Sequence, residues 1–197
     1  MRWTAVMLAA DLPPGAAAGT TVDGTDLAVW RSASGAVHAW TDRCPHRGMR
    51  LSHGFVRGET LACIYHGWRY GTDGACRHIP AHPSLTPPKT IAATDHACRE
   101  AGGLIWVGGT GEPPVIEHPH PVRSLEVAAP PEAVARAFGA AEGVRVLDLD
   151  GRAATLALQP VASAATRIHA LCARPDDRLA LSRALDARRA RAEGDAA

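Results

Sequence analysis

Two short stretches, Cys44-Pro45-His46-Arg47-Gly48 and Cys63-Ile64-Tyr65-His66-Gly67-Trp68, decide how the first part of this chain folds. Each stretch offers one thiolate and one imidazole, and sixteen residues separate His46 from Cys63. A dinuclear iron–sulfur cluster can use such a set, because one iron takes both cysteine sulfurs and the other takes both histidine nitrogens. The sequence therefore predicts a [2Fe–2S] cluster, one per chain, bound by Cys44, His46, Cys63 and His66.

The residues beside these ligands suit the same site. Gly48 and Gly67 allow positive φ and a close backbone approach, and Pro45 stiffens the first loop. Zinc is the main alternative, since it also accepts two cysteines and two histidines. Common zinc sites place the cysteines first and the histidines later, whereas here the two types alternate. The pattern favours the iron–sulfur cluster over zinc, and over loop residues without a shared ligand.

The sequence around the two stretches is rich in short strand-like runs. Turn signals such as Ser34-Gly35 and Asp73-Gly74 separate them, as in antiparallel sandwiches and small barrels. We therefore expect a mainly β fold over residues 1–114, an antiparallel β-sandwich. The expected strands are Trp3–Leu8, Leu27–Arg31, Val37–Thr41, Thr60–Ile64, Trp68–Tyr70 and Leu104–Val107.

The stretch from Gly111 to Pro121 contains four prolines and predicts an extended linker, placed at residues 115–121. Residues 122–197 then read as a small α+β region. One helix is expected from Pro131, and a last helix begins after Pro175, capped by Asp176 or Asp177. The expected strands of this region are Ser124–Ala128, Val144–Leu149, Ala153–Leu158 and Thr166–Leu171.

The stretch from Cys44 to Pro83 resembles the Rieske domain of Rieske non-haem iron oxygenases, of the aromatic-ring hydroxylase and vanillate demethylase type. Besides the two ligand stretches, Arg69-Tyr70, Asp73-Gly74, His78-Ile79-Pro80 and Gly103–Val107 carry the resemblance. It implies the same four ligands, with both histidines near solvent. Respiratory Rieske proteins have an extra cysteine in each loop; Met49 and Tyr65 stand there instead. The resemblance thus points to the branch at the lower-potential end of the Rieske range.

Oxygenases of this type also bind a mononuclear iron through two histidines and one carboxylate. After residue 121 the chain has one histidine, His169, so we expect no such site. His78 and His82 are four residues apart, but Pro80 lies between them, and they are expected to be structural. His118 and His120 lie in the linker. The C-terminal region resembles a remnant of the oxygenase catalytic domain; an unrelated α+β cap is the alternative.

These features predict an electron-transfer component of a Rieske oxygenase system. A reductase or ferredoxin would donate electrons, and an oxygenase subunit on a separate chain would accept them. A stand-alone Rieske ferredoxin and a redox-sensing or assembly subunit are the alternatives. Around the exposed histidines, Arg47, Arg50 and Trp68 are candidates for the rim that contacts a partner.

Composition and apolar patterning bear on the partners and the cellular compartment of the protein. The formal charge is +1, which gives no sign of a nucleic-acid or anionic-membrane partner. The apolar run Trp3–Ala10 is too short to span a membrane and is expected to be a strand. Five cysteines form a poor disulfide framework and suit a reducing compartment, so a cytoplasmic protein is expected, with Cys76, Cys98 and Cys172 as buried small residues. No glycine-rich dinucleotide fingerprint is present.

Overall fold

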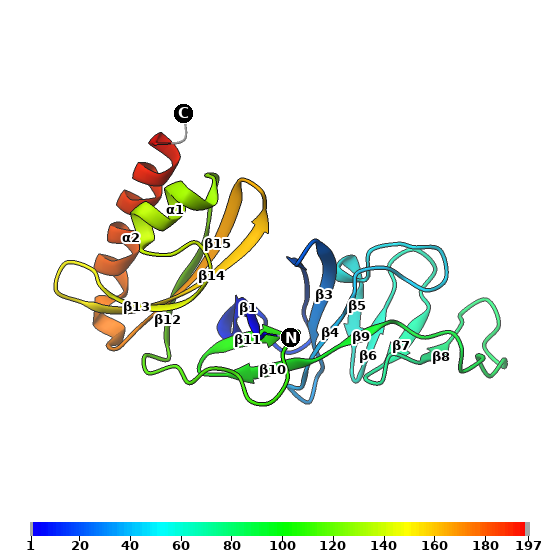
Figure 1. The fold of residues 1–197 in the computed structure, drawn as a ribbon. Coiled ribbons are helices and arrows are strands. Elements are labelled where there is room, and N and C mark those ends of the chain that lie inside the picture. The colour runs from blue at the N-terminus through cyan, green and yellow to red at the C-terminus, as the bar shows by residue number, and fades with distance from the viewer. Residues whose placement is uncertain (1, 196–197) are drawn as a thin grey trace. The chain divides into compact units, whose positions relative to one another are not determined.

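The computed structural model describes residues 2–195, which form two compact units (Figure 1). The first comprises Leu12–Thr21 and Thr25–Arg99 and carries both Cys/His stretches; we call it the loop unit. The remaining described residues form the second, which we call the sheet–helix unit.

The loop unit contains two four-stranded sheets and a short 3-10 helix, Leu51–His53 (η2). One sheet has the order β2-β3-β4-β9, formed by β2 (Ala17–Val22), β3 (Thr25–Arg31), β4 (Val37–Thr41) and β9 (Asp95–His96). The other has the order β5-β6-β7-β8, formed by β5 (Phe55–Arg57), β6 (Thr60–Ala62), β7 (Arg69–Gly71) and β8 (Cys76–His78).

A buried aromatic cluster forms the core of the loop unit. The rings of Trp30 and Trp40 are 4.9 Å apart, and Tyr70 meets Trp40 edge-on at 6.5 Å. All three side chains are fully buried, together with Leu51 and Leu61. Large aromatic side chains supply much of the apolar area that stabilises a small β fold, so this core anchors the strands that lead into the two loops.

The sheet–helix unit also contains two sheets. The three-stranded sheet β1-β11-β10 is formed by β1 (Thr4–Leu8), β11 (Leu104–Val107) and β10 (Cys98–Ala101), and the chain passes from the loop unit to the sheet–helix unit within β10. A 3-10 helix (η1, Ala9–Asp11) follows β1. The antiparallel sheet β12-β15-β14-β13 is formed by β12 (His120–Val127), β15 (Ala165–Cys172), β14 (Ala153–Ala162) and β13 (Gly143–Asp148). The helices are α1 (Pro131–Phe138), η3 (Pro175–Asp177) and α2 (Arg178–Gly194).

Side-chain alternation lets the sheet β12-β15-β14-β13 bury both of its faces. Leu156 joins one core with the helix residues Phe138 and Leu181, whereas its neighbour Ala157 joins a second core with Trp106 of β11. Successive residues of a strand point to opposite faces, so one strand contributes to both cores. The helices thus cover one face, and β1 and β11 pack against the other.

These observations confirm the predicted fold class, a mainly antiparallel β protein with a small α+β C-terminal region. The predicted strand ends differ in places. β6 ends at Ala62 rather than at residue 64, because Cys63 already begins a tight turn. β12 begins at His120, inside the predicted linker. Pro121 fits there because β12 is an edge strand with an irregular register between Pro121 and Arg123.

The two units are not bounded at residue 114, where the sequence analysis places the end of the first domain. Residues 2–11 and 100–114 pack with the C-terminal region, because β1 and β11 cover one face of its sheet. The capping expectation for α2 is also corrected. Asp177 occupies the N-cap position without a side-chain capping bond, since its carboxylate instead accepts hydrogen bonds from Arg174 at 3.0 and 3.2 Å.

Candidate metal centre

The first Cys/His loop follows β4 and closes on itself through two backbone hydrogen bonds. The N–H of Cys44 donates to the carbonyl of Met49 at 2.8 Å, and the N–H of Gly48 donates to the carbonyl of Cys44 at 2.8 Å. Gly48 has φ of 74°, in the left-handed region where a side chain is strained. The predicted need for glycine at this position is confirmed.

The second loop, between β6 and β7, repeats the same pattern residue for residue. The N–H of Cys63 donates to the carbonyl of Trp68 at 2.9 Å, and the N–H of Gly67 donates to the carbonyl of Cys63 at 2.9 Å. Gly67 has φ of 67°. In both loops the backbone therefore holds the cysteine at the base and turns the histidine toward the tip.

The two loops bring the four predicted ligand residues together. The ring centroids of His46 and His66 are 4.7 Å apart. Cys44 and Cys63 are 3% and 2% exposed, whereas His46 is half-buried and His66 is exposed. The thiols thus lie inside the unit and the imidazoles at its surface.

The surroundings of the two thiols favour their role as metal ligands. Burial raises the pKa of the Cys63 thiol, and the backbone N–H groups of Tyr65 and His66 oppose this by hydrogen bonding to its sulfur. The hydroxyl of Tyr70 lies 3.1 Å from Sγ of Cys44. Burial and the hydrogen bond with Cys44 raise the pKa of Tyr70, so the phenol keeps its proton and can donate it to the sulfur. Donors aimed at sulfur stabilise the thiolate form that binds metal.

The imidazoles are fixed by aromatic neighbours. The ring of Trp68 stacks on His46 with centroids 4.1 Å apart and an interplanar angle of 6°, and Tyr65 contacts His66 at 3.9 Å. Partial desolvation, followed by the charges of His66 and Arg47, lowers the pKa of His46. A neutral imidazole is the form that binds a metal, so this environment also fits a ligand role. Trp68 of the second loop thus packs on the histidine of the first loop and, on its other side, against the buried core of the unit.

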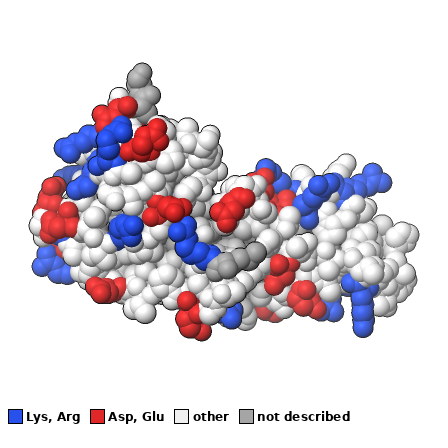
Figure 2. Space-filling view, viewed as in Figure 1, with Lys and Arg blue, Asp and Glu red and all other residues white. Residues whose placement is uncertain are grey.

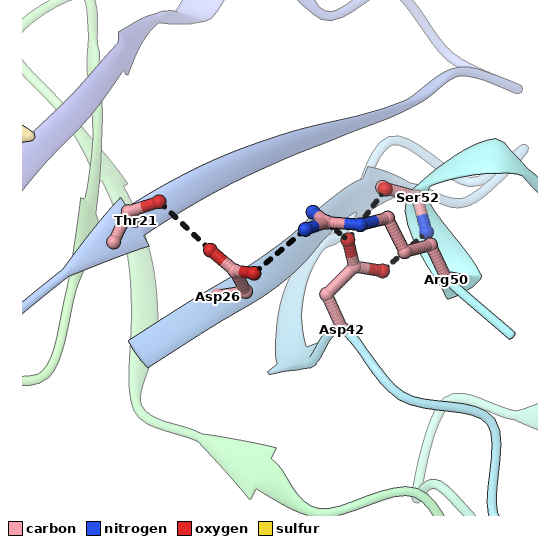
Figure 3. A network of polar contacts seen from close by, with 5 residues as sticks. All are labelled: Thr21, Asp26, Asp42, Arg50 and Ser52. Carbon is pink, nitrogen blue, oxygen red and sulfur yellow. Dashed lines mark hydrogen bonds and ion pairs between the residues drawn. The ribbon is translucent and has the colours of Figure 1, made fainter. Parts of the chain in front are cut away.

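A buried carboxylate clamps the base of the first loop (Figure 3). The Asp42 side chain is fully buried and accepts hydrogen bonds from the N–H and the hydroxyl of Ser52, both at 2.7 Å. Arg50 reaches the same carboxylate at 3.4 Å and binds Asp26 at 2.8 Å. Asp26 in turn accepts a hydrogen bond from Thr21 at 3.0 Å. Residues on both sides of the loop are thereby tied to β2 and β3.

This network changes the interpretation of Arg50. The sequence analysis placed Arg50 beside Arg47 as a rim residue, whereas the structure ties its guanidinium to two carboxylates. Arg47 remains exposed next to His46. On the face shown in Figure 2, basic and acidic side chains are interspersed rather than separated into fields of one sign. Sequence reasoning missed Asp42, Ser52 and Tyr70, because their roles come from contacts across 10 and 26 positions of the chain.

The other histidines singled out by the sequence are not part of the two Cys/His loops. His78 is half-buried in β8 and His82 is exposed. His118 bonds to the hydroxyl of Thr155 at 3.1 Å. His169 is buried in β15 between Ser124 and Gln159, and burial lowers its pKa to about 3, so it stays neutral.

Within residues 2–195, no group of three or more histidine, cysteine, aspartate or glutamate side chains is placed to hold a metal ion. A Rieske-type cluster does not require such a group, because each iron takes only two protein ligands. In the same range, no helix combines the length and apolar character needed to cross a membrane.

Comparison with known proteins assigns the class of the first part of the chain. Residues 2–98 match the Rieske [2Fe-2S] domain family. The chain therefore contains a Rieske domain, and its cofactor is a Rieske-type [2Fe–2S] cluster. The predicted cofactor and the resemblance to the Rieske oxygenase family are confirmed.

The relatives include proteins named as monooxygenases, oxygenase subunits and an oxidoreductase. The oxidoreductase NdmD of Pseudomonas putida is 42% identical over 115 residues, which are 57% of this chain and 19% of that protein. The 4beta-methylsterol monooxygenase of Methylococcus capsulatus is 42% identical over 88 residues, 43% of this chain and 23% of that protein. The matched part of the chain thus spans about a fifth of the length of these curated relatives.

Solved structures share the fold over a longer range. The crystal structure of apo dicamba monooxygenase has a TM-score of 0.75 at 18% identity, covering 98% of this chain and 85% of that one. NdmB of Pseudomonas putida CBB5 has a TM-score of 0.72 at 21% identity, covering 98% of this chain and 81% of that one. The similarity of fold therefore extends beyond the Rieske domain into the sheet–helix unit.

Proposed function

We propose that Cys44 and Cys63 ligate one iron of the cluster, that His46 and His66 ligate the other, and that the chain carries single electrons within a Rieske oxygenase system. The observation that carries this proposal is the pair of loops with matching hydrogen bonds, which place two thiols inside and two imidazoles 4.7 Å apart at the surface. The bound cluster supplies one-electron redox chemistry. The protein residues hold it in place and set its environment.

The exposed histidines define where electrons enter and leave. Electron tunnelling falls steeply with distance, so a partner must approach the ligand that lies nearest to solvent. His66 is exposed and His46 is half-buried, whereas both cysteines are buried. A reductase or ferredoxin would therefore donate electrons at this tip, and an oxygenase centre on a separate chain would accept them there.

The sheet–helix unit is proposed to be a shortened form of the oxygenase catalytic domain. Support comes from the fold similarity to oxygenases over 98% of the chain. In those oxygenases a two-histidine, one-carboxylate site would hold the catalytic iron. The buried His169 pairs with Ser124 and Gln159 rather than with a carboxylate, which suits a scaffold more than an iron site.

The test is stopped-flow reduction followed by oxygen consumption. The purified protein, with its cluster, is mixed with a ferredoxin-type reductase and NADH, and reoxidation is followed with and without an oxygenase subunit that lacks its own electron source. We expect reduction by the reductase, slow reoxidation alone, and fast substrate-coupled reoxidation when the oxygenase is added. Substrate-coupled oxygen consumption without the oxygenase would contradict the proposal.

The hydrogen bond from Tyr70 to Cys44 predicts a change in reduction potential. Removing the hydroxyl with Tyr70→Phe takes away a donor that favours the more electron-rich reduced state, so the midpoint potential should fall. A hydrogen bond worth about 0.5–1.5 kcal/mol corresponds to roughly 20–60 mV for one electron. Redox titration followed by EPR measures the shift.

The matched control is Tyr65→Phe, which keeps the ring that contacts His66 and removes an exposed hydroxyl. Its potential should equal that of the wild type within measurement error. An equal shift in both variants, or none in Tyr70→Phe, would show that the 3.1 Å contact does not tune the cluster.

A further inference from the structure

A hollow of about 310 Å³ lies beside the first Cys/His loop, within the loop unit. It is lined by residues 44–48 of that loop together with Thr41, Arg43, Ala92 and Thr94. Its permanently charged side chains are Arg43 and Arg47, and no carboxylate is among the described residues that line it. We call it the arginine hollow.

The two guanidiniums of the arginine hollow are not neutralised by the protein. Arg43 and Arg47 are both exposed, and within the described part of the chain neither guanidinium has a hydrogen-bonded or ion-paired partner. Arg50, which follows the same loop, shows the opposite arrangement, since Asp26 and Asp42 balance its charge (Figure 3). Positive charges that share a concave surface raise the local concentration of anions. The hollow therefore favours a ligand that carries two negative charges.

Gly48 lets the Arg43 side chain lie against the first loop. A Cβ atom added to Gly48 would be 3.3 Å from Nε of Arg43 and 3.8 Å from one of its terminal nitrogens. The guanidinium thus packs over the glycine, where a larger residue would press on it. An arginine placed in this way loses less entropy when it binds, and its planar fork can give paired hydrogen bonds to an oxyanion.

The same hollow reaches the iron–sulfur site. His46, a proposed ligand of the cluster, is one of its lining residues. Negative charge bound there would disfavour the extra electron of the reduced cluster, so the anion should bind more tightly to the oxidised protein. By linkage, the bound anion then lowers the midpoint potential by the same free energy.

From these features we propose that the arginine hollow binds a small tetrahedral dianion of the phosphate or sulfate class through Arg43 and Arg47, and that the bound anion lowers the potential of the cluster. Anion binding depends only on the hollow, whereas the effect on the potential rests on the proposed ligand role of His46. The bound anion would also neutralise Arg47, whose charge the proposed docking of a partner uses.

The binding test uses sulfate as the probe and methanesulfonate as its matched control, because a methyl group replaces one oxygen and removes one negative charge. The cluster-containing protein is titrated with each anion by isothermal titration calorimetry, with potassium chloride keeping the ionic strength constant. Sulfate should bind at one site in the millimolar range and about tenfold more tightly than methanesulfonate. Equal affinities for the two anions would overturn the proposal.

Two variants and a matched control locate the site. Arg43→Gln and Arg47→Gln should each weaken sulfate binding by about tenfold, because each removes one charged donor. Arg69→Gln should leave the affinity unaltered, since Arg69 is an exposed arginine of β7 in the same unit that does not line the hollow. Unchanged binding in Arg43→Gln, or an equal loss in Arg69→Gln, would also overturn the proposal.

Redox titration at the same ionic strength provides the second measurement. If sulfate binds the oxidised form about fivefold more tightly than the reduced form, saturating sulfate lowers the midpoint potential by about 40 mV, because a tenfold ratio corresponds to about 59 mV for one electron. Methanesulfonate at the same concentration should have a much smaller effect. Sulfate binding without a change in potential would overturn the coupling and count against His46 as a ligand, whereas absence of sulfate binding would leave the ligand assignment untouched.

Discussion

Cys63→Ser should abolish cluster binding and leave a protein that retains less than about a tenth of the wild-type iron. A serine hydroxyl stays protonated near neutral pH and is a hard ligand, so it cannot replace the soft anionic thiolate that iron–sulfur clusters require. The wild type should contain two irons and two acid-labile sulfides per chain, with the low average g value of a Rieske-type EPR signal. Iron and sulfide analysis and EPR measure the loss.

The matched control is Cys98→Ser. Cys98 is a half-buried cysteine on β10, outside both loops, and burial raises its pKa to about 12, so its thiol stays protonated. This variant should keep the full complement of iron and sulfide. Stoichiometric zinc without iron in the wild type, or full iron in Cys63→Ser, would show that the ligand assignment is wrong.

Arg47→Glu should slow electron exchange with the partner by about tenfold at low salt, and the deficit should shrink as ionic strength rises. Arg47 is exposed and adjacent to His46, so its charge acts on the approach of a partner to the tip. The visible and EPR spectra of the cluster should remain those of the wild type. Stopped-flow reduction at several salt concentrations provides the measurement.

Arg183→Glu is the control for this prediction, because Arg183 is an exposed residue of α2 in the sheet–helix unit. It should change the rate little. Arg50 is unsuitable for the test, since a charge reversal there would also disturb the buried Asp42 and the base of the first loop. A salt-independent effect of Arg47→Glu would argue against electrostatic docking at the tip.

The sequence was most informative about features that depend on residues close together in the chain. The alternation of cysteine and histidine predicted the cluster, and Gly48 and Gly67 predicted the positive φ angles of the two loops. Strands β4 and β11 were predicted with their observed ends, because turn residues bound them on at least one side. The ligand residues themselves stay a prediction until iron binding is measured.

The features that the sequence did not reveal depend on contacts between distant positions. The bond from Tyr70 to Cys44 and the clamp of Asp42 on Ser52 exist only once the strands are paired. Packing of the N-terminal strand β1 with the C-terminal sheet likewise has no local signal. Proline composition was misleading at Pro121, because an edge strand tolerates a residue that donates no ladder hydrogen bond.

The repeated pair of backbone hydrogen bonds in the two loops also affects the reorganisation energy of electron transfer. Each loop is closed by its own amide groups, so the positions of the cysteine and histidine side chains do not depend on a metal to draw the chain together. Ligands held in this way move little when the iron changes oxidation state, which keeps the inner-sphere reorganisation energy small. Exchange can then proceed rapidly with a partner of nearly equal potential, and in either direction.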